Sequence, residues 1–324
     1  MRRCRRMLSA ALVCLLPLMI SQCATGKNGV NDRSVTSIDP AVWASSPHFA
    51  GKTRAGGRAG KKASAEDEME RLLVQGDLSL GFGDYHSSLL NYLEILKDQP
   101  DRHDIRYRVG VIFLLNGQLE AAKQELARVL LKQPEMLEAH EAMALVHLQE
   151  KNYPLAMEEF QLVLSRDPQR VKAHHFLGIT YLSAGQVPRA ISSLETAVRL
   201  DPEHVLSYVA LGQANLKLKR YPQAIEWLQK GLRLDPKNVK MNHHLGMALA
   251  ALRRYPEALQ AFMAAGDEAQ ALNNIGVHYY MEGRYEEAAR CFQKAIELRP
   301  YYYEEAKINL QRALEKLHEQ GGSG

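Results

Sequence analysis

A proline recurs every 34 residues along the middle of this chain, which has 324 residues. The members of the series are Pro100, Pro134, Pro168, Pro202 and Pro236. A fixed period of this length is typical of stacked supersecondary units, each too small to bury its own apolar face. The period therefore predicts a solenoid of repeated units rather than a domain built around one core.

Three more columns of residues keep the same register. The first contains small residues: Gly76, Gly110, Ala144, Gly178, Gly212, Gly246 and Gly276. The second, twelve positions later, is also small: Ser88, Ala122, Ala156, Ala190, Ala224, Ala258 and Ala288. The third, four positions further on, is large: Tyr92, Leu126, Phe160, Leu194, Leu228, Phe262 and Phe292. Small residues let two helices approach closely, and a large side chain then fills the remaining space at native packing density.

One period shows how the unit is built. In the period from Val171 to Pro202 an apolar, helix-length pattern ends at Gly185, which can adopt the left-handed conformation of a helix C-cap. Pro188 then opens a second helix at a position where its missing N–H costs nothing. Asp201 is expected to accept a backbone N–H where the next helix begins. Each period therefore encodes a helix, a turn and a second helix.

The period and these columns resemble the tetratricopeptide repeat (TPR) family. The resemblance implies an all-α, right-handed superhelical solenoid of about seven helix-turn-helix repeats with a C-terminal capping helix. The expected repeats begin near Met69, His103, Leu137, Val171, Val205, Val239 and Ala269. We expect the array over 67–302, the capping helix over 303–319 and a flexible tail over 320–324. The last interval is 30 residues, and we expect Gly266 to shorten the second helix of the sixth repeat.

The N-terminus carries a targeting pattern. Four arginines within residues 1–6 precede the apolar run Met7–Ile20, as in a secretory signal, and the run is too short for a comfortable membrane span. The residues Ile20–Cys23 resemble a bacterial lipobox, although Gln22 stands where Gly, Ala or Ser is usual. The resemblance implies a signal peptide over 1–22 and lipidation of Cys23. The chain would then be anchored in the bacterial envelope, at the outer membrane facing the periplasm. A cleaved soluble periplasmic protein and an uncleaved anchor are the alternatives.

Charge separates the next segment from the array. Residues 23–66 are rich in Gly, Ser and Ala and predict a flexible linker. Within it, Ala24–Ala63 has seven basic and two acidic residues, a net charge of +5. Without residues 1–22 the whole chain holds 37 basic and 37 acidic residues, so the remainder carries −5. An acidic array is unsuited to nucleic acid, which needs a basic face on the fold.

Catalytic and metal-binding patterns are weak in this sequence. His140, His147 and His174 could approach one another across two repeats, but two of them stand in a packing column. The remaining cysteine of the array, Cys291, is expected to be a small structural residue. We found no phosphate-binding loop or nucleophile elbow. We therefore expect no enzyme activity, cofactor, metal or small-molecule substrate.

The resemblance also implies a binding surface for proteins. In TPR proteins the concave face is lined by the fifth, ninth and twelfth positions of each first helix, and these positions share one helix face. The candidate groove residues are Tyr107, Val111, Leu114, Leu145, Leu148, His175, Ile179, Leu182, Gln213, His243, Met247, Asn273, Asn274, Val277 and Tyr280. The same stripe includes Glu141, Val209, Leu216 and Ala250. Such a groove suits an extended peptide or an amphipathic helix. The alternative is that several of these residues pack against the adjacent repeat.

The functional class that follows is a non-catalytic scaffold for other proteins, tethered to a membrane. The segment from Ala271 to Leu310 is similar to TPR lipoproteins of tight-adherence (Flp) pilus assembly, which implies help in assembling a secretin or an inner-membrane platform. A cell-wall adaptor that docks peptidoglycan enzymes and an accessory subunit of polysaccharide export are alternatives. The sequence does not separate the three.

Overall fold

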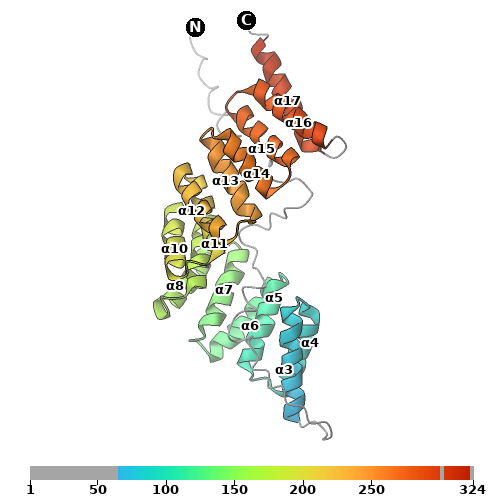
Figure 1. The fold of residues 1–324 in the computed structure, drawn as a ribbon. Helices are drawn as coiled ribbons and strands as arrows, with labels where there is room; N and C mark the ends of the chain where they lie inside the picture. The colour runs from blue at the N-terminus through green and yellow to red at the C-terminus, as the bar shows by residue number, and fades with distance from the viewer. Residues whose placement is uncertain (1–64, 300–302, 322–324) are drawn as a thin grey trace, which may run out of the picture. The chain divides into compact units, whose positions relative to one another are not determined.

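The computed structural model describes residues 65–299 and 303–321, and in these ranges every element is helical (Figure 1). The predicted signal peptide, Cys23 and nearly all of the predicted linker lie outside the described residues. The helices are α3 (Ala65–Gly81), α4 (Tyr85–Asp98), α5 (His103–Leu115), α6 (Leu119–Lys132), α7 (Leu137–Gln149), α8 (Tyr153–Arg166), α9 (Val171–Ser183), α10 (Val187–Leu200), α11 (Val205–Lys217), α12 (Tyr221–Leu234), α13 (Val239–Ala251), α14 (Tyr255–Ala265), α15 (Glu268–Met281), α16 (Tyr285–Leu298) and α17 (Glu304–Gly321).

The helices form pairs, as the period predicts. Contacts join α3 to α4, α5 to α6, α7 to α8, α9 to α10, α13 to α14 and α15 to α16. The chain falls into two compact units, which divide between Ser207 and Tyr208 inside α11. The prediction of an all-α solenoid of helix-turn-helix repeats with a final extra helix is confirmed. The right-handed superhelix stays a prediction.

The columns of small and large residues form the contact between the two helices of a repeat. A Cβ atom placed on Gly178 would lie 2.6 Å from Cγ of Leu194, and one on Gly246 would lie 2.6 Å from the ring of Phe262. Leu194 and Ala190 are fully buried. Because glycine has no side chain, the two helices of a repeat can approach closely. The large residue of the second helix then fills the space beside the glycine.

The turn inside each repeat places one residue in the left-handed region. Four repeats have glycine there, and Gly185 has φ of 76° as predicted. The other three repeats use non-glycine residues at the same point: Lys151 with φ of 60°, Lys219 with φ of 57° and Arg253 with φ of 61°. A residue with a Cβ pays about 1–2 kcal/mol for this conformation.

We expect Lys219→Gly to raise the free energy of unfolding by about 1 kcal/mol, because it removes that strain from an exposed turn position. The reciprocal change Gly185→Lys should lower it by a similar amount. Urea denaturation followed by circular dichroism measures both. Changes of the same sign would contradict the assignment of strain to this position.

The sixth repeat is shortened as predicted. Its second helix, α14, has 11 residues where α12 has 14, and Gly266 is its C-cap. Asp267 then caps α15 by accepting from the backbone N–H of Gln270 at 2.9 Å, and it pairs with Arg299. The chain therefore passes from the shortened α14 directly into the capped start of α15, without a longer loop between them.

The expected helix after the array is α17. Ala306 of this helix and Tyr303, directly before it, pack with Ala269 and Ala295 of the seventh repeat, which covers the open end of the array. The helix ends at Gly321, two residues beyond the end predicted at 319.

The aspartates before the prolines act differently from the prediction. Asp201 Oδ1 accepts from the backbone N–H of Glu203 at 3.0 Å, and Asp167 Oδ1 from that of Gln169 at 3.1 Å. These amides lie inside the Asp-Pro turn, two residues on, and not at the start of the next helix. The short reach of the side chain selects this local turn.

Candidate functional site

The structure divides the fifteen candidate groove residues by exposure. Nine are buried: Tyr107, Val111, Leu114, Leu145, Leu148, His175, Ile179, Leu182 and Asn273. Six are partly exposed: Gln213, His243, Met247, Asn274, Val277 and Tyr280. The groove assignment stays a prediction, and the partly exposed residues are the ones that a partner could reach directly.

In the last repeat, residues of the stripe lie next to the capping helix α17. Asn309 of α17 donates to Oδ1 of Asn273 at 3.1 Å, in buried surroundings. Val277 and Tyr280 pack against a cluster that includes Ala313 of α17. At this end of the array, Asn273 therefore contacts the chain's own terminal helix, and Val277 and Tyr280 pack against a cluster to which that helix contributes.

A charged cluster lies between α7 and the start of α9, in the unit that ends at Ser207, and is centred on Arg170, the N-cap residue of α9. Its guanidinium pairs with Glu138, with Glu141 at 3.0 Å and with Asp167 at 3.1 Å. The cluster joins the third repeat to the fourth. The stripe indicated Glu141, but no sequence signal marked Arg170, since the other repeats have Arg102, Met136, His204 and Asn238 in its column.

Glu141 is the most constrained member of the cluster. It is 8% exposed, and its Oε1 atom has no hydrogen-bond partner. Burial raises the pKa of its carboxyl to about 7, against the attraction of Arg170. The carboxyl group is therefore poised to change its charge near neutral pH.

Two histidines share one serine beside this cluster. The Oγ of Ser207 lies 3.0 Å from Nδ1 of His175 and 2.8 Å from Nδ1 of His204. The serine has one hydroxyl proton, so it donates to one imidazole and accepts from the other. Burial and the neighbouring His204 lower the pKa of His175 to about 3, so this ring stays neutral in the folded protein.

Acid should therefore destabilise the unit that ends at Ser207. An unfolded histidine binds its proton near pH 6.5, whereas folded His175 does so only near pH 3, so stability falls as the pH drops below 6.5. We expect His175 to account for a loss of about 2 kcal/mol between pH 6.5 and 5. Glu141 contributes with the opposite sign, since its folded pKa is raised.

The comparison of wild type with His175→Phe isolates this effect, because the remaining groups are common to both proteins. Urea denaturation at pH 7, 6 and 5 should show a shallower fall in the variant. Parallel pH profiles would contradict the assignment to His175.

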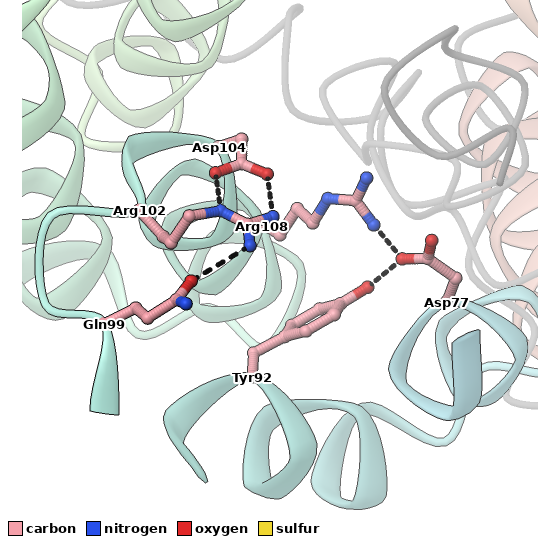
Figure 2. Close-up of polar contacts among 6 residues, drawn as sticks. All are labelled: Asp77, Tyr92, Gln99, Arg102, Asp104 and Arg108. Carbon is pink, nitrogen blue, oxygen red and sulfur yellow. Dashed lines mark hydrogen bonds and ion pairs between the residues drawn. The ribbon is translucent and has the colours of Figure 1, made fainter. Parts of the chain in front are cut away.

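A second ionic network ties the first repeat to the second (Figure 2). The same Oδ1 atom of Asp77 accepts from the Tyr92 hydroxyl at 2.5 Å and pairs with Arg108. Burial works to lower the pKa of Arg108, but the hydrogen bond and charge of Asp77 outweigh it, and the pKa is raised. No motif in the sequence indicated this network. The available signal was a charged residue in a column that holds Ala142, Phe176 and Ala210 elsewhere.

The described residues hold no group of three or more His, Cys, Asp or Glu side chains that could bind a metal ion. His140 contacts Glu159 at 2.6 Å and the carbonyl of Pro134 at 2.8 Å. Cys291 is half-buried, and burial raises the pKa of its thiol, which disfavours the reactive thiolate. None of the helices from α3 to α17 is long and apolar enough to cross a bilayer.

Comparison with protein families decides the classification of the chain. Tetratricopeptide repeat profiles match residues 73–125, 115–171 and 177–239, and a further one matches 269–302. The chain belongs to the tetratricopeptide repeat family. A search of curated proteins found no match. Proteins of this family serve as scaffolds that bind other proteins and peptides and are typically non-catalytic.

Solved structures support the same fold for this TPR chain. pilF of Pseudomonas aeruginosa is 24% identical with a TM-score of 0.52, over 66% of this chain and 97% of that one. A TPR protein from Parabacteroides merdae is 15% identical with a TM-score of 0.54, over 76% and 99%. The APC/C assembly Cut9–Hcn1 is 18% identical with a TM-score of 0.56, over 78% of this chain and 49% of that one. At these identities the likeness shows the fold alone.

Proposed function

We propose that this TPR chain is a membrane-tethered scaffold that helps to assemble a machine of the bacterial envelope, such as a Flp or type IV-like pilus or its secretin. The observation that carries the scaffold part is the run of repeats whose first-helix stripe offers partly exposed side chains on α11, α13 and α15. The tether rests on the basic head, the short apolar run and the lipobox-like residues before Cys23. The proposed role in pilus assembly is based on the similarity of the last repeat and α17 to tight-adherence lipoproteins.

The partner surface is proposed to be the stripe itself. Met247 of α13 belongs to the stripe, and Asn274 of α15 is the candidate groove residue next to Asn273 of the stripe. Both are partly exposed, and α13 and α15 contact each other. An extended peptide or a helix laid there would bury apolar surface and meet scattered polar groups. Ile179 and Leu182 are buried, so charging them would test folding rather than binding.

The test is a crosslinked pull-down from native membranes with wild type and with Met247→Glu combined with Asn274→Glu. The matched control is Leu252→Glu combined with Met263→Glu, since these side chains are 39% and 45% exposed and lie outside the stripe. We expect the stripe variant to lose secretin or pilus-platform subunits and the control to keep them. Retention of every partner by the stripe variant would overturn the proposed surface.

The identity of the lost partner separates the alternatives. Loss of peptidoglycan hydrolases or synthases would assign the protein to cell-wall adaptors, and loss of export subunits to polysaccharide export. Lipidation has its own measurement: Cys23→Ser should abolish radiolabelled palmitate incorporation and release the chain from membranes. Unchanged membrane association and labelling would contradict the lipid anchor.

A further inference from the structure

The turns inside the fifth and sixth repeats concentrate positive charge. Lys219 and Arg220 follow α11, and Arg253 and Arg254 occupy the same two columns after α13. In each of the other five repeats these two columns hold at most one basic residue. We call the four side chains the turn ridge.

The two turns lie on one edge of the unit that begins at Tyr208. A Cβ atom placed on Gly231 of α12 would lie 2.5 Å from Sδ of Met241 on α13 and 2.7 Å from Cβ of Tyr208 on α11, so these three helices meet. As the first helices of successive repeats, α11 and α13 end at the same edge, and packed helices lie about 8–10 Å apart. The four basic side chains therefore share one surface.

The positive charge of the turn ridge is only partly balanced by the protein. Lys219 and Arg220 are exposed, and their side chains form no ion pair within residues 65–299 and 303–321. The two arginines of the sixth repeat each pair with one glutamate, at 3.2 and 2.6 Å. Neither α11 nor α13 contains an aspartate or a glutamate. The ridge therefore stays positive although residues 64–324 carry a net charge of −5.

Two of these side chains occupy strained turn positions. Lys219 has φ of 57° and Arg253 has φ of 61°, where four other repeats have glycine. A left-handed residue with a Cβ costs free energy, and such strain is typical of positions whose side chain has a use. Lys151 has the same conformation in the third repeat, but the uncharged Asn152 follows it. The charge, rather than the conformation, therefore distinguishes the turn ridge.

The residues beside the ridge indicate the class of partner. Tyr221 and Tyr255 directly follow Arg220 and Arg254 and are partly exposed. Clusters of lysine and arginine are attracted to anionic lipid headgroups, and tyrosine is enriched where a protein meets the membrane surface. An acidic protein would meet the same charges, but the proposed tether keeps lipid at a high effective concentration beside the array. A lipid surface therefore fits the ridge better.

We propose that the turn ridge binds anionic phospholipid headgroups, so that the unit Tyr208–Gly324 lies with this edge against the membrane. This inference rests on the proposed function only for the tether. It does not involve the partner stripe, because the stripe variant Met247→Glu with Asn274→Glu leaves all four ridge residues unchanged.

The experiment uses the full chain on vesicles of phosphatidylcholine alone or with about 30% phosphatidylglycerol, followed by amide hydrogen exchange and mass spectrometry. Peptides that cover residues 217–221 and 251–255 should exchange at least about threefold more slowly on the anionic vesicles. The difference should disappear in about 0.5 M salt, where charges are screened beyond about 4 Å. Each protein is compared with itself on the two vesicles, so its anchor and its basic segment 24–63 are the same in both.

The ridge variant is Lys219→Gly combined with Arg253→Gly, which restores the residue that other repeats have at this position. Each basic side chain near an anionic surface contributes about fivefold to binding, so the variant should bind about 25-fold more weakly and lose the protection. Both changes remove left-handed strain, so unfolding would not explain the loss. The matched control is Lys132→Gln combined with Lys151→Gly, which removes two positive charges outside the ridge and should keep the protection.

Equal protection in the ridge variant and in the control would overturn the inference. Wild type that shows no protection on anionic vesicles, while the ridge variant loses an acidic protein in the pull-down, would overturn lipid binding and assign the ridge to that protein. Flotation with the neutral vesicles reports on the tether alone, since the ridge has no charge to meet there. Failure of the tether is therefore distinguishable from failure of the ridge.

Discussion

Replacing Asp77 by asparagine is expected to lower the free energy of unfolding by about 3 kcal/mol, because it removes the carboxylate from a buried ion pair and leaves Arg108 without that charge. The side chains of Asp77 and Arg108 are only 11% and 9% exposed, so water cannot replace the lost interaction. The Tyr92 hydroxyl would keep an acceptor, since asparagine has the same shape. The loss therefore measures charge rather than volume.

Asp104→Asn is the matched control, because Asp104 pairs with Arg102 nearby (Figure 2) and its side chain is 42% exposed, against 11% for Asp77. An exposed pair contributes about 0–1 kcal/mol, so this variant should remain close to wild type. Urea denaturation of both variants, followed by circular dichroism, provides the comparison. Equal losses in the two variants would show that burial does not set the strength of the Asp77 pair.

The fold was predictable from the periodicity because the two helices pack through the same contact in each repeat. Gly178 with Leu194 and Gly246 with Phe262 are the same contact in different repeats, so one period explained the others. The shortened α14 was predictable for the same reason, since Gly266 interrupts a column that is regular elsewhere. Lys219 was not predictable at a left-handed turn position, because its own side chain gives no sign of that conformation.

The candidate site was less predictable because it depends on departures from the period. The column of Arg170 is not regular, Ser207 has no counterpart in its column, and the contacts of both residues cross from one repeat to the next. Burial was also invisible in the pattern: Ile179 and Gln213 occupy the same position of their repeats, yet one is buried and the other is partly exposed. The regular columns thus predict the helical scaffold, whereas the residues that depart from these columns form the polar contacts of the candidate site.

Replacing Gly246 by isoleucine is expected to lower the free energy of unfolding by about 3 kcal/mol, since a Cβ there already lies 2.6 Å from the ring of Phe262 on the second helix of the sixth repeat. Phe262 is 2% exposed, so its ring can give way only by displacing other buried groups. The gain in helix propensity from replacing glycine is less than about 1 kcal/mol and cannot offset the clash. Alanine would be less informative, because the third repeat has Ala144 in this column together with the buried Phe160.

Thermal and urea denaturation of Gly246→Ile should be compared with Gly81→Ile, where a Cβ meets nothing within 4 Å. Phe262→Ala alone should cost about 3–5 kcal/mol through the cavity that it leaves. Combined with Gly246→Ile it should cost at least 1 kcal/mol less than the sum of the two single changes, because isoleucine then fills part of that cavity. Strict additivity would mean that the two side chains do not share one space, and the column would lose its role in setting how closely the helices approach.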